Sequence, residues 1–286
     1  MGAELLRRGH AVAVLSAGGE REEVLRDKGL GIHSFPIRTK NILSPRLFFA
    51  LPRIVGLVRR ERFDLLHAHS RVTQVLAALV SFFTGVPFIS TAHGFYRRRL
   101  GRRLFPAWGR RVVAVSPLVA EELEKTHKVA RSRIRVIFNA MDTAAYRKRV
   151  LSHNPSEIRR RLGISESAFV IGSVSRLVRD KGHEYLVEAV ARLRKKHEDI
   201  FLLVAGDGRE RKSLEKLVRR RGLAGRSVWI PSTPDTSGLL SVMDVFAHPA
   251  TYREGFGLAM LEATVAKVPV IATNIWAINS IIRNHV

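Results

Sequence analysis

The sequence of 286 residues contains no cysteine. Disulfide bonds, thiolate zinc sites and cysteine nucleophiles are therefore excluded, which fits a protein of a reducing compartment. No basic-then-apolar leader is recognised, so we do not expect a secreted product. Asp-x-Asp pairs and the fingerprints of Walker, Ser-triad and hydride-cofactor sites are also missing. The sequence thus predicts neither a dedicated Mg²⁺ site nor an organic cofactor.

Acidic residues are scarce, because 25 Asp and Glu stand against 49 Lys and Arg and give a formal net charge of +24. The positive electrostatic field of such a chain favours anionic partners, namely phosphorylated small molecules, anionic lipid surfaces or nucleic acid. The net charge alone does not choose among these three classes. The 46% hydrophobic content is that of a globular protein. Disordered, collagenous and coiled-coil classes are therefore excluded.

Long apolar runs are almost lacking, although the stretch Val72–Ala92 holds no charged residue. Gly85 and Pro87 divide it into a helix of about 13 residues and a short strand, too short to cross a bilayer of ~30 Å. We therefore expect a buried helix followed by a strand.

Short apolar runs alternate with basic amphipathic stretches along the whole chain. Continuous Val, Ile and Leu runs between helices are typical of parallel sheets covered on both faces, so the predicted fold class is α/β. We predict helices at Pro45–Arg60, Pro117–Thr126, Gly182–Lys196 and Glu210–Arg220. We predict strands at Ala11–Leu15, Ile32–Pro36, Leu65–His69, Pro87–Thr91, Val112–Val115, Arg135–Phe138, Phe169–Val174, Phe201–Ala205, Val228–Ile230, Val245–Ala247 and Val268–Ala272.

A domain boundary is predicted between Asn139 and about Ser156, where a turn and a polar, Pro-containing segment follow each other. The two domains are then residues 1–150 and 151–286. Each carries its own series of βα units, so we expect two Rossmann-like, doubly wound domains that face each other across a cleft. Ligands of such sheets bind at the carboxyl ends of the strands.

The most informative motif is the segment from Glu254 to Glu262, in which two carboxylates flank a Gly-rich turn that opens a helix. Glycines let the backbone approach a ligand, and the free amides of a helix start bind phosphate or sugar oxygens. We expect Glu262 about two turns inside the helix. The alternative is a capped helix with two carboxylates near its start, which the helix dipole favours without any ligand.

A second motif joins Arg176 and Lys181 in the loop after the strand Phe169–Val174. The two cations are close enough in sequence to converge on one pyrophosphate, the guanidinium as a fork and the ammonium as a point charge. A solvated basic loop is the alternative in so basic a chain. The position at a strand's carboxyl end favours ligand binding.

Weaker signals are the Gly206 turn after the strand Phe201–Ala205, which a tight connection explains by itself, and His93 at a strand end in the first domain. His93 could contact a sugar or phosphate, although most single histidines are structural. His67 and His69 alternate on one strand, and no metal is expected there.

Together these motifs resemble the retaining glycosyltransferases of family 4, which have the two-domain GT-B fold, and the resemblance covers nearly the whole chain. Single pieces are moderately specific, while their order and spacing are distinctive. The pieces are Leu5–Val12, Asp64–His69, Ala92–Gly94, Val113–Ser116, Val136–Asn139, Ser175–Leu177 with Lys181 and Gly182, Ala205–Gly208 and Glu254–Glu262.

The resemblance implies a nucleotide-sugar donor, bound as a substrate mainly by the second domain, and an acceptor bound mainly by the first. Catalytic roles fall on His93, near the donor sugar, and on Glu254, which holds hydroxyls of the transferred sugar. Glu262 matches the carboxylate that holds the ribose. Retention in this family is described as same-face attack, so no protein nucleophile is expected. The donor-binding residues that we carry over or assign are Arg176, Lys181, Gly206, Gly255, Phe256, Gly257, Leu258 and Glu262.

Two departures from the family pattern concern the ends of the chain. We expect the chain to begin on a helix, before the strand Ala11–Leu15, where relatives begin with a strand. It ends soon after the strand Val268–Ala272. We therefore expect a fragment that lacks the first strand and the C-terminal end of the enzyme. In addition, Ile275–Ala277 replaces a Gly-rich loop on the donor side.

We therefore predict a metal-independent, hexosyltransferase-type glycosyltransferase that acts on a lipid- or polysaccharide-linked acceptor of the cell envelope. We expect it in the cytoplasm, peripheral at the inner membrane face. The alternative is a catalytically impaired relative or a basic binding module for anionic ligands or nucleic acid, although no nucleic-acid-binding motif is recognised. The predicted membrane segment combines Arg97, Arg98, Arg99, Arg102 and Arg103 with Phe95, Tyr96, Leu100, Leu104 and Trp108.

Overall fold

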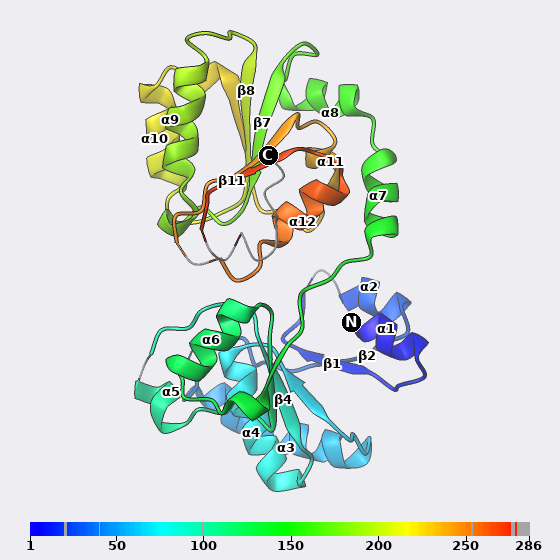
Figure 1. Cartoon of the computed structure of the whole chain (residues 1–286). Helices are drawn as coiled ribbons and strands as arrows, with labels where there is room; N and C mark the ends of the chain where they lie inside the picture. The colour runs from blue at the N-terminus through cyan, green and yellow to red at the C-terminus, as the bar shows by residue number, and fades with distance from the viewer. Residues whose placement is uncertain (20–21, 40, 99, 253, 276–277, 279–286) are drawn as a thin grey trace. The chain divides into compact units, whose positions relative to one another are not determined.

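The computed structural model describes the chain except for residues 20–21, 40, 99, 253, 276–277 and 279–286. It divides into two compact units, each with its own α/β core (Figure 1). Unit 1 comprises Met1–Ala114 and Ala120–Val136, and unit 2 comprises Val115–Val119 and Ile137–Val286. The units are described one at a time below.

Unit 1 alternates helices and strands along the chain, as the sequence predicted. The two long helices that flank β3 pack against each other, and short elements follow. The helices are α1 (Gly2–Arg7), α2 (Glu22–Asp27), α3 (Pro45–Arg60), α4 (Arg71–Thr84), α5 (Leu100–Leu104), α6 (Pro117–Lys125) and η1 (Arg131–Arg133); the strands are β1 (Ala13–Ser16), β2 (Gly31–Ser34), β3 (Leu66–Ala68), β4 (Phe88–Ala92), β5 (Arg111–Ala114) and β6 (Ile134–Val136).

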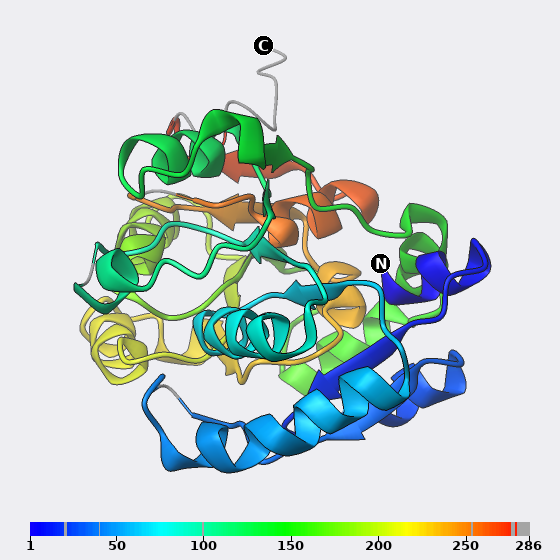
Figure 2. The same cartoon turned by 90° about the horizontal axis from the view of Figure 1, so that it is seen from below.

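The strands of unit 1 form two parallel sheets. One sheet pairs β1 with β2, and the other has the order β3-β4-β5-β6. The two sheets share one core, because Leu15 of β1 and Leu66 of β3 pack against a cluster of buried side chains drawn mainly from α3 and α4. Figure 2 shows the chain from below. The prediction of parallel α/β structure is confirmed, and the strands of this unit divide between two sheets.

Local signals explain the ends of α4. The hydroxyl of Ser70 accepts a hydrogen bond from the Thr73 amide, and the Thr73 side chain bonds back to the Ser70 amide, which forms a capping box. Gly85 ends the helix with a φ of 75°, a conformation that glycine adopts without cost. The uncharged stretch is thus a helix followed by β4, as predicted. Among the described residues, no helix combines the length and apolarity needed to cross a bilayer.

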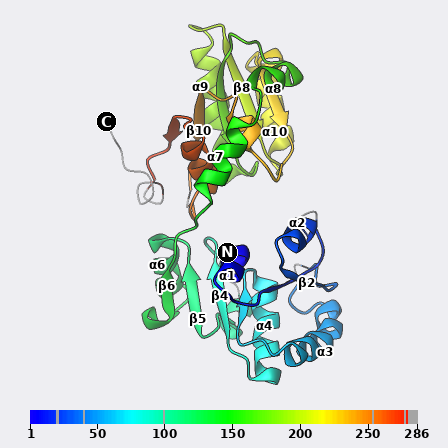
Figure 3. The same ribbon diagram turned by 90° about the vertical axis from the view of Figure 1, so that its right-hand side faces the viewer.

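Unit 2 has the longer and more deeply buried strands, and every residue of β8 is buried. Helices α7 and α8 follow each other along one side of it (Figures 1 and 3). The helices are α7 (Thr143–Leu151), α8 (Pro155–Leu162), η2 (Arg179–Lys181), α9 (His183–Leu193), α10 (Arg211–Arg220), η3 (Ala224–Arg226), α11 (Ser237–Leu240) and α12 (Leu258–Val265); the strands are β7 (Phe169–Val174), β8 (Ile200–Ala205), β9 (Ser227–Ile230), β10 (Val245–His248) and β11 (Val270–Ala272).

The five strands of unit 2 form one parallel sheet in the order β11-β10-β7-β8-β9. Its two faces carry separate cores, because alternate residues of a strand point to opposite sides. Val170 and Leu203 pack with α7, α8, α11 and α12, whereas Ile171 and Leu202 pack with α9 and α10. Figure 1 shows α9 and α10 on one side of the sheet and α11 and α12 on the other.

Two helices of unit 2 begin inside the segment that the sequence predicted as a boundary. Asp142 caps α7 through a bond from the Ala145 amide, and Asn154 caps α8 through the Glu157 amide. Residues 152–154 therefore form the turn between α7 and α8 within unit 2. The division into an acceptor-side domain of residues 1–150 and a donor-binding domain of residues 151–286 stays a prediction.

Candidate functional site

The loops after β7 and β8 lie against each other at the carboxyl end of the unit 2 sheet. The amide of Ser175 donates to the Ala205 carbonyl over 3.1 Å, and the amide of Leu177 donates to the Asp207 carbonyl over 2.9 Å. Gly206 has a φ of 148°, and a Cβ there would overlap the Ser175 carbonyl. Glycine at position 206 is therefore required by the close approach of two loops.

The loop that carries Lys181 is fixed to the loop after β10. The amide of Thr251 donates to the Asp180 carbonyl over 3.0 Å. Gly182 has a φ of 64°, and a Cβ there would overlap the Pro249 carbonyl oxygen. The carboxyl ends of β7 and β10 thus present one continuous backbone surface, as expected for a ligand site of a parallel sheet.

Lys181, His248 and Glu254 form a buried cluster on this surface. The Lys181 ammonium forms an ion pair with Glu254 Oε2, and His248 Nε2 lies 3.0 Å from the same oxygen. The other oxygen, Oε1, accepts a bond from the Gly255 amide over 3.1 Å. The side chains of Lys181, His248 and Glu254 are only 16%, 3% and 12% exposed. The structure therefore brings together two of the predicted site residues.

The carboxyl group of Glu254 is strongly stabilised as the anion. Burial acts to raise its pKa, but the hydrogen bond from His248 and the charge of Lys181 outweigh burial and bring the pKa to about 2. Glu254 is therefore a carboxylate at neutral pH and can only accept hydrogen bonds. Three contacts use part of its four acceptor positions, which leaves capacity for a ligand hydroxyl.

A second histidine near this cluster is His183, the first residue of α9. It is 2% exposed, and its Nε2 lies 3.2 Å from the Ser175 hydroxyl. Burial lowers the pKa of His183 to about 4, and His248 and Lys181 act in the same direction. The ring is therefore neutral at pH 7. Its Nδ1 is buried without a hydrogen-bond partner in the described structure.

Glu262 contacts the loop before α11. It is the fifth residue of α12, so it lies about one turn inside the helix, and the predicted depth of two turns is wrong. The Thr236 hydroxyl donates to Glu262 Oε2 over 2.8 Å, and the Tyr146 hydroxyl lies 2.7 Å from the Thr236 oxygen. Glu262 is thus held by a chain of hydroxyl groups.

The Gly-rich turn before α12 has the expected form. Gly257 is the N-cap of the helix with a φ of 75°. The Phe256 side chain is 7% exposed and packs near Phe138, with ring centroids 6.2 Å apart, whereas Leu258 is 46% exposed. The side chain of Phe256 is therefore part of the core, and only its backbone remains for the predicted contact with a donor. Arg176 is exposed at the end of β7.

His93 belongs to unit 1 and lies at the carboxyl end of β4. Its Nε2 is 3.0 Å from Nδ1 of His69, and the rings are stacked. His67 of β3 has its ring centroid 4.2 Å from that of His69, which follows the strand, and it contacts the Thr91 hydroxyl over 2.8 Å. Burial lowers the pKa of all three imidazoles, and that of His67 falls to about 4. Within the described residues, no group of acidic and histidine side chains has the arrangement of a metal site.

The predicted membrane segment is only partly exposed. Trp108 and Arg102 are 3% and 9% exposed, and the Arg102 guanidinium lies 4.5 Å from the ring centroids of both Tyr96 and Trp108. Arg102 also donates to Gln74 over 3.2 Å. Placing Trp108 and Arg102 at a surface was therefore wrong, because cation–π contacts hold them inside unit 1. Arg99 lies outside the described residues, as do Trp276 and Ala277 of the loop noted above.

Sequence reasoning missed four residues of these clusters: His183, His248, Tyr146 and Thr236. His248 is the last residue of the apolar strand β10, and this position at the carboxyl end of a strand is a signal that could have found it. Tyr146 and Thr236 are separated from Glu262 by long stretches of chain. No local spacing connects them, so only the folded chain reveals the contact.

Comparison with known families assigns both halves of the chain. The model described as Glycosyltransferase Family 4 matches residues 1–145, and the model described as Glycosyl transferases group 1 matches residues 154–286. An uncharacterized glycosyltransferase of Methanocaldococcus jannaschii is 25% identical over 99% of this chain and 76% of its own length. A galactosyltransferase of Escherichia coli that acts on GlcNAc-diphosphoundecaprenol is 26% identical over 87% of this chain and 68% of its own length.

Solved structures share the fold. A glycosyltransferase of Rickettsia africae superposes with a TM-score of 0.81 at 23% identity, over 99% of this chain and 76% of that one. HepE of Anabaena in complex with UDP-glucose superposes with a TM-score of 0.77 at 24% identity, over 97% of this chain and 78% of that one. Together with the parallel α/β structure of both halves and the two family matches, these findings show that the chain belongs to glycosyltransferase family 4 and is an enzyme of the glycosyltransferase class.

Proposed function

We propose that this glycosyltransferase moves a hexosyl group from a nucleotide-sugar donor to a lipid- or polysaccharide-linked acceptor, with retention and without a metal ion. The observation that carries the proposal is the buried Lys181–Glu254–His248 cluster at the carboxyl end of the unit 2 sheet. It combines a carboxylate for sugar hydroxyls with a cation next to the predicted phosphate site.

The leaving group of this reaction is a nucleoside diphosphate, whose negative charge must be stabilised as the glycosyl–phosphate bond breaks. Arg176 is exposed and Lys181 is largely buried in one loop, and the α12 helix begins directly after the Gly-rich turn. A guanidinium, an ammonium and helix amides can together stabilise the negative charge that a metal ion would otherwise stabilise. The lack of Asp-x-Asp in the sequence supports independence from a metal.

Glu254 suits the sugar rather than the phosphates. Its carboxylate is an anion at neutral pH, so it repels phosphate oxygens and accepts hydrogen bonds from hydroxyl groups. Lys181 contacts one of its oxygens and would lie between the sugar and the pyrophosphate. The Lys181–Glu254 ion pair would therefore hold the group that binds the phosphates next to the group that binds the sugar.

Retention requires that the new bond forms on the face from which the old one leaves. The acceptor oxygen bonds to the anomeric carbon, the bond from that carbon to the phosphate oxygen breaks with its electron pair, and the acceptor proton passes to that oxygen. The role that we propose for the protein is to hold the donor while this exchange occurs. No covalent intermediate with a side chain is needed.

The names of similar proteins support a nucleotide hexose as the donor. The E. coli relative is named for UDP-galactose, and the Anabaena structures contain UDP-glucose or UDP with glucose. The diphosphoundecaprenol acceptor of the E. coli protein supports a lipid-linked acceptor and a role in the cell envelope. We place the reaction in the cytoplasm, at the inner face of the membrane.

A thermal-shift screen across UDP-, GDP- and ADP-hexoses tests the donor, because a bound donor raises the melting temperature by mass action. We expect one nucleotide series to stabilise the protein, and the active donor to release nucleoside diphosphate in the presence of chelator. Loss of release in chelator would contradict the metal-independent reaction. Stabilisation by random DNA, lost in salt, together with no response to any sugar nucleotide would instead favour the basic binding module.

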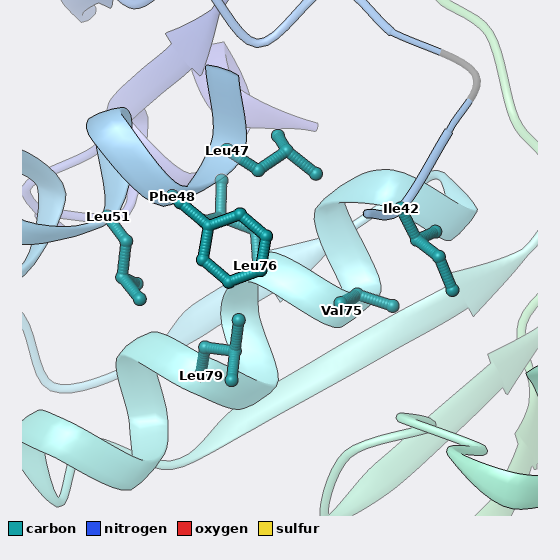
Figure 4. A pocket seen from close by; sticks show the side chains of 7 residues that line it. All are labelled: Ile42, Leu47, Phe48, Leu51, Val75, Leu76 and Leu79. Atoms are coloured by element: carbon teal, nitrogen blue, oxygen red, sulfur yellow. The ribbon is translucent and has the colours of Figure 1, made fainter. Parts of the chain in front are cut away.

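Unit 1 has a surface that supports contact with an anionic membrane. Residues 28–120 contain 16 Lys and Arg but only two acidic residues, Glu61 and Asp64. An apolar pocket lies between α3 and α4 of this unit, and exposed apolar side chains lie next to it (Figure 4). We define this apolar surface by the exposed Leu43, Phe48, Phe49, Leu100 and Leu104, which are 59–79% exposed.

The parts of the apolar surface are neighbours in the fold. Ile42 lines the pocket together with Phe48 and lies beside Gly101 of α5. The Arg71 guanidinium donates to the carbonyls of Gly101 and Phe105 over 3.1 and 2.6 Å, which fixes α5 to the start of α4. Arg97, Arg98 and Arg103 are exposed and close in sequence to Leu100 and Leu104. Exposed apolar side chains combined with arginines suit the headgroup region of an anionic bilayer.

A further inference from the structure

A chain of three side chains stands behind the carboxylate that we assign to the ribose. The Tyr146 hydroxyl lies 2.7 Å from the Thr236 hydroxyl, which donates to Glu262 Oε2 over 2.8 Å. The three residues come from α7, from the loop before α11 and from α12. Tyr146 is 90 residues from Thr236, so the contact is purely tertiary.

The direction of the hydrogen bonds follows from the number of protons. A threonine hydroxyl has one proton, and the Glu262 carboxylate can only accept it. Thr236 therefore has no proton left for Tyr146, and the phenol must be the donor of the first bond. Each bond polarises the next one, so the chain acts as a unit that ends on the carboxylate.

The surroundings keep this chain in place. Tyr146 and Thr236 are 3% and 9% exposed. Burial raises the pKa of Tyr146 to about 12, so the phenol keeps the proton that it donates. The next residue along, Ser237, contacts His153 Nε2 over 2.9 Å, which ties the start of α11 to the turn after α7.

We propose that Tyr146 is a positioning residue for nucleotide binding. Through Thr236 it holds the Glu262 side chain in the one orientation that accepts hydrogen bonds from the ribose hydroxyls of a nucleoside diphosphate. A glutamate side chain has several rotatable bonds, and fixing them before the ligand arrives reduces the entropy that binding must overcome. The proposal rests on the proposed function and, within it, on the assignment of Glu262 to the ribose of the donor, which the family resemblance implies.

The test uses calorimetry with UDP and with 2′,3′-dideoxy-UDP, and with the GDP and ADP pairs if the parent prefers another base. Tyr146→Phe keeps the buried ring and removes only the hydroxyl. We expect it to weaken UDP about 3- to 10-fold, in the range of one altered hydrogen bond, and to leave the dideoxy affinity unchanged. A merely structural role would weaken both nucleotides equally, because both share the base and the phosphates.

Two further variants keep the test independent of the folding of Tyr146→Phe. Thr236→Val has nearly the same shape without the hydroxyl, and Thr236→Ser keeps the hydroxyl. We expect the valine variant to show the ribose-selective loss and the serine variant to bind like the parent. Tyr185→Phe is the matched control, since Tyr185 is 59% exposed on α9, and it should change neither affinity.

Equal weakening of UDP and its dideoxy form, or no weakening in either Tyr146→Phe or Thr236→Val, would overturn the inference. Glu262→Gln separates this failure from that of the proposed function. If Glu262→Gln also fails to distinguish the two nucleotides, the ribose assignment itself is wrong. If Glu262→Gln loses UDP selectively while the Tyr146 and Thr236 variants do not, only the positioning role is wrong.

Discussion

Nδ1 of His69 lies 3.0 Å from Nε2 of His93 at the carboxyl ends of two neighbouring strands, β3 and β4. Two imidazole nitrogens that face each other share one proton, so one ring donates and the other accepts. Burial lowers the pKa of both rings, which keeps them neutral at pH 7. The tautomer of His93 is therefore coupled to that of His69.

This coupling predicts that His69→Leu reduces turnover by up to about 10²-fold, the cost of displacing a group near the reacting atoms by about 1 Å. The affinity for free nucleotide should stay unchanged. His69→Asn offers an amide at a similar place and should recover part of the rate. The acid limb of the pH–rate profile should lie below pH 6.5 in the parent and shift in His69→Leu. Equal losses in both variants with an unchanged pH profile would leave His69 with a structural role only.

Arg176→Ala and Lys181→Ala should each weaken the donor through loss of a charge-assisted contact of roughly 1.5–3 kcal/mol. Lys181→Ala should also reduce turnover, because it removes the cation that contacts Glu254. Titration with the nucleotide sugar measures both effects. Arg179→Ala, an exposed cation of the same loop, is the matched control and should bind like the parent. Parent-like donor affinity in both test variants would refute the pyrophosphate assignment.

A second pair of variants should distinguish the roles of the Glu254 and Glu262 carboxylates. Glu254→Gln should reduce turnover about 10²-fold or more, as loss of a positioned electrostatic contact does, with little effect on free nucleotide. Glu262→Gln should weaken the nucleotide itself through the ribose. Steady-state kinetics combined with titration of UDP, GDP or ADP measures the difference. Free nucleotide bound equally well by parent and Glu262→Gln would show that Glu262 is misassigned.

Stability should fall between pH 6.5 and pH 4, because His183 has a pKa of about 4 in the folded protein and 6.5 in the unfolded chain. Above pH 6.5 the ring is neutral in both states, so its full contribution is present. As the pH falls through this window, the unfolded chain binds the proton and the folded protein does not. The loss from His183 is on the order of 3 kcal/mol and saturates below pH 4.

Urea unfolding at several pH values measures this loss. The slope of the unfolding free energy against pH gives the number of protons taken up on unfolding. His183→Gln should reduce that number by up to one in this window. The Glu254 contribution is separable, because its pKa is about 2 and its effect is lost only as the pH falls from 4.5 toward 2. An unchanged slope between pH 6.5 and pH 4 in His183→Gln would contradict the assignment.

The apolar surface of unit 1 should bind anionic vesicles and not neutral ones at low salt. Phe49→Ser and Leu104→Ser should each reduce binding several-fold, because these side chains are 79% and 75% exposed. Leu151→Ser is the control, since Leu151 is 69% exposed on α7 of unit 2. Co-sedimentation with phosphatidylglycerol and phosphatidylcholine vesicles measures the partitioning. Equal binding to both lipids would exclude charge-directed association.

The sequence by itself determined the α/β class and the order of the elements. Each predicted strand is present within about three residues, and Pro45–Arg60 and Phe169–Val174 are the helix and strand that were predicted. Such local signals suffice because buried parallel strands need continuous apolar runs, and helices need caps such as Ser70 and Asn154. Lys181 and Glu254 were also selected from the sequence. Their predicted roles in the site await the variants above.

The tertiary structure decided what surrounds these residues. It placed His248 on Glu254, joined Tyr146 and Thr236 to Glu262, and buried Trp108 and Arg102, which the sequence had suggested for a membrane surface. It also divided the strands of unit 1 between two sheets. None of this follows from local pattern, because these contacts join residues far apart in the chain or depend on which face packs inward. Burial and partner geometry set the charge state and orientation of a side chain, and both arise only when the whole unit is folded.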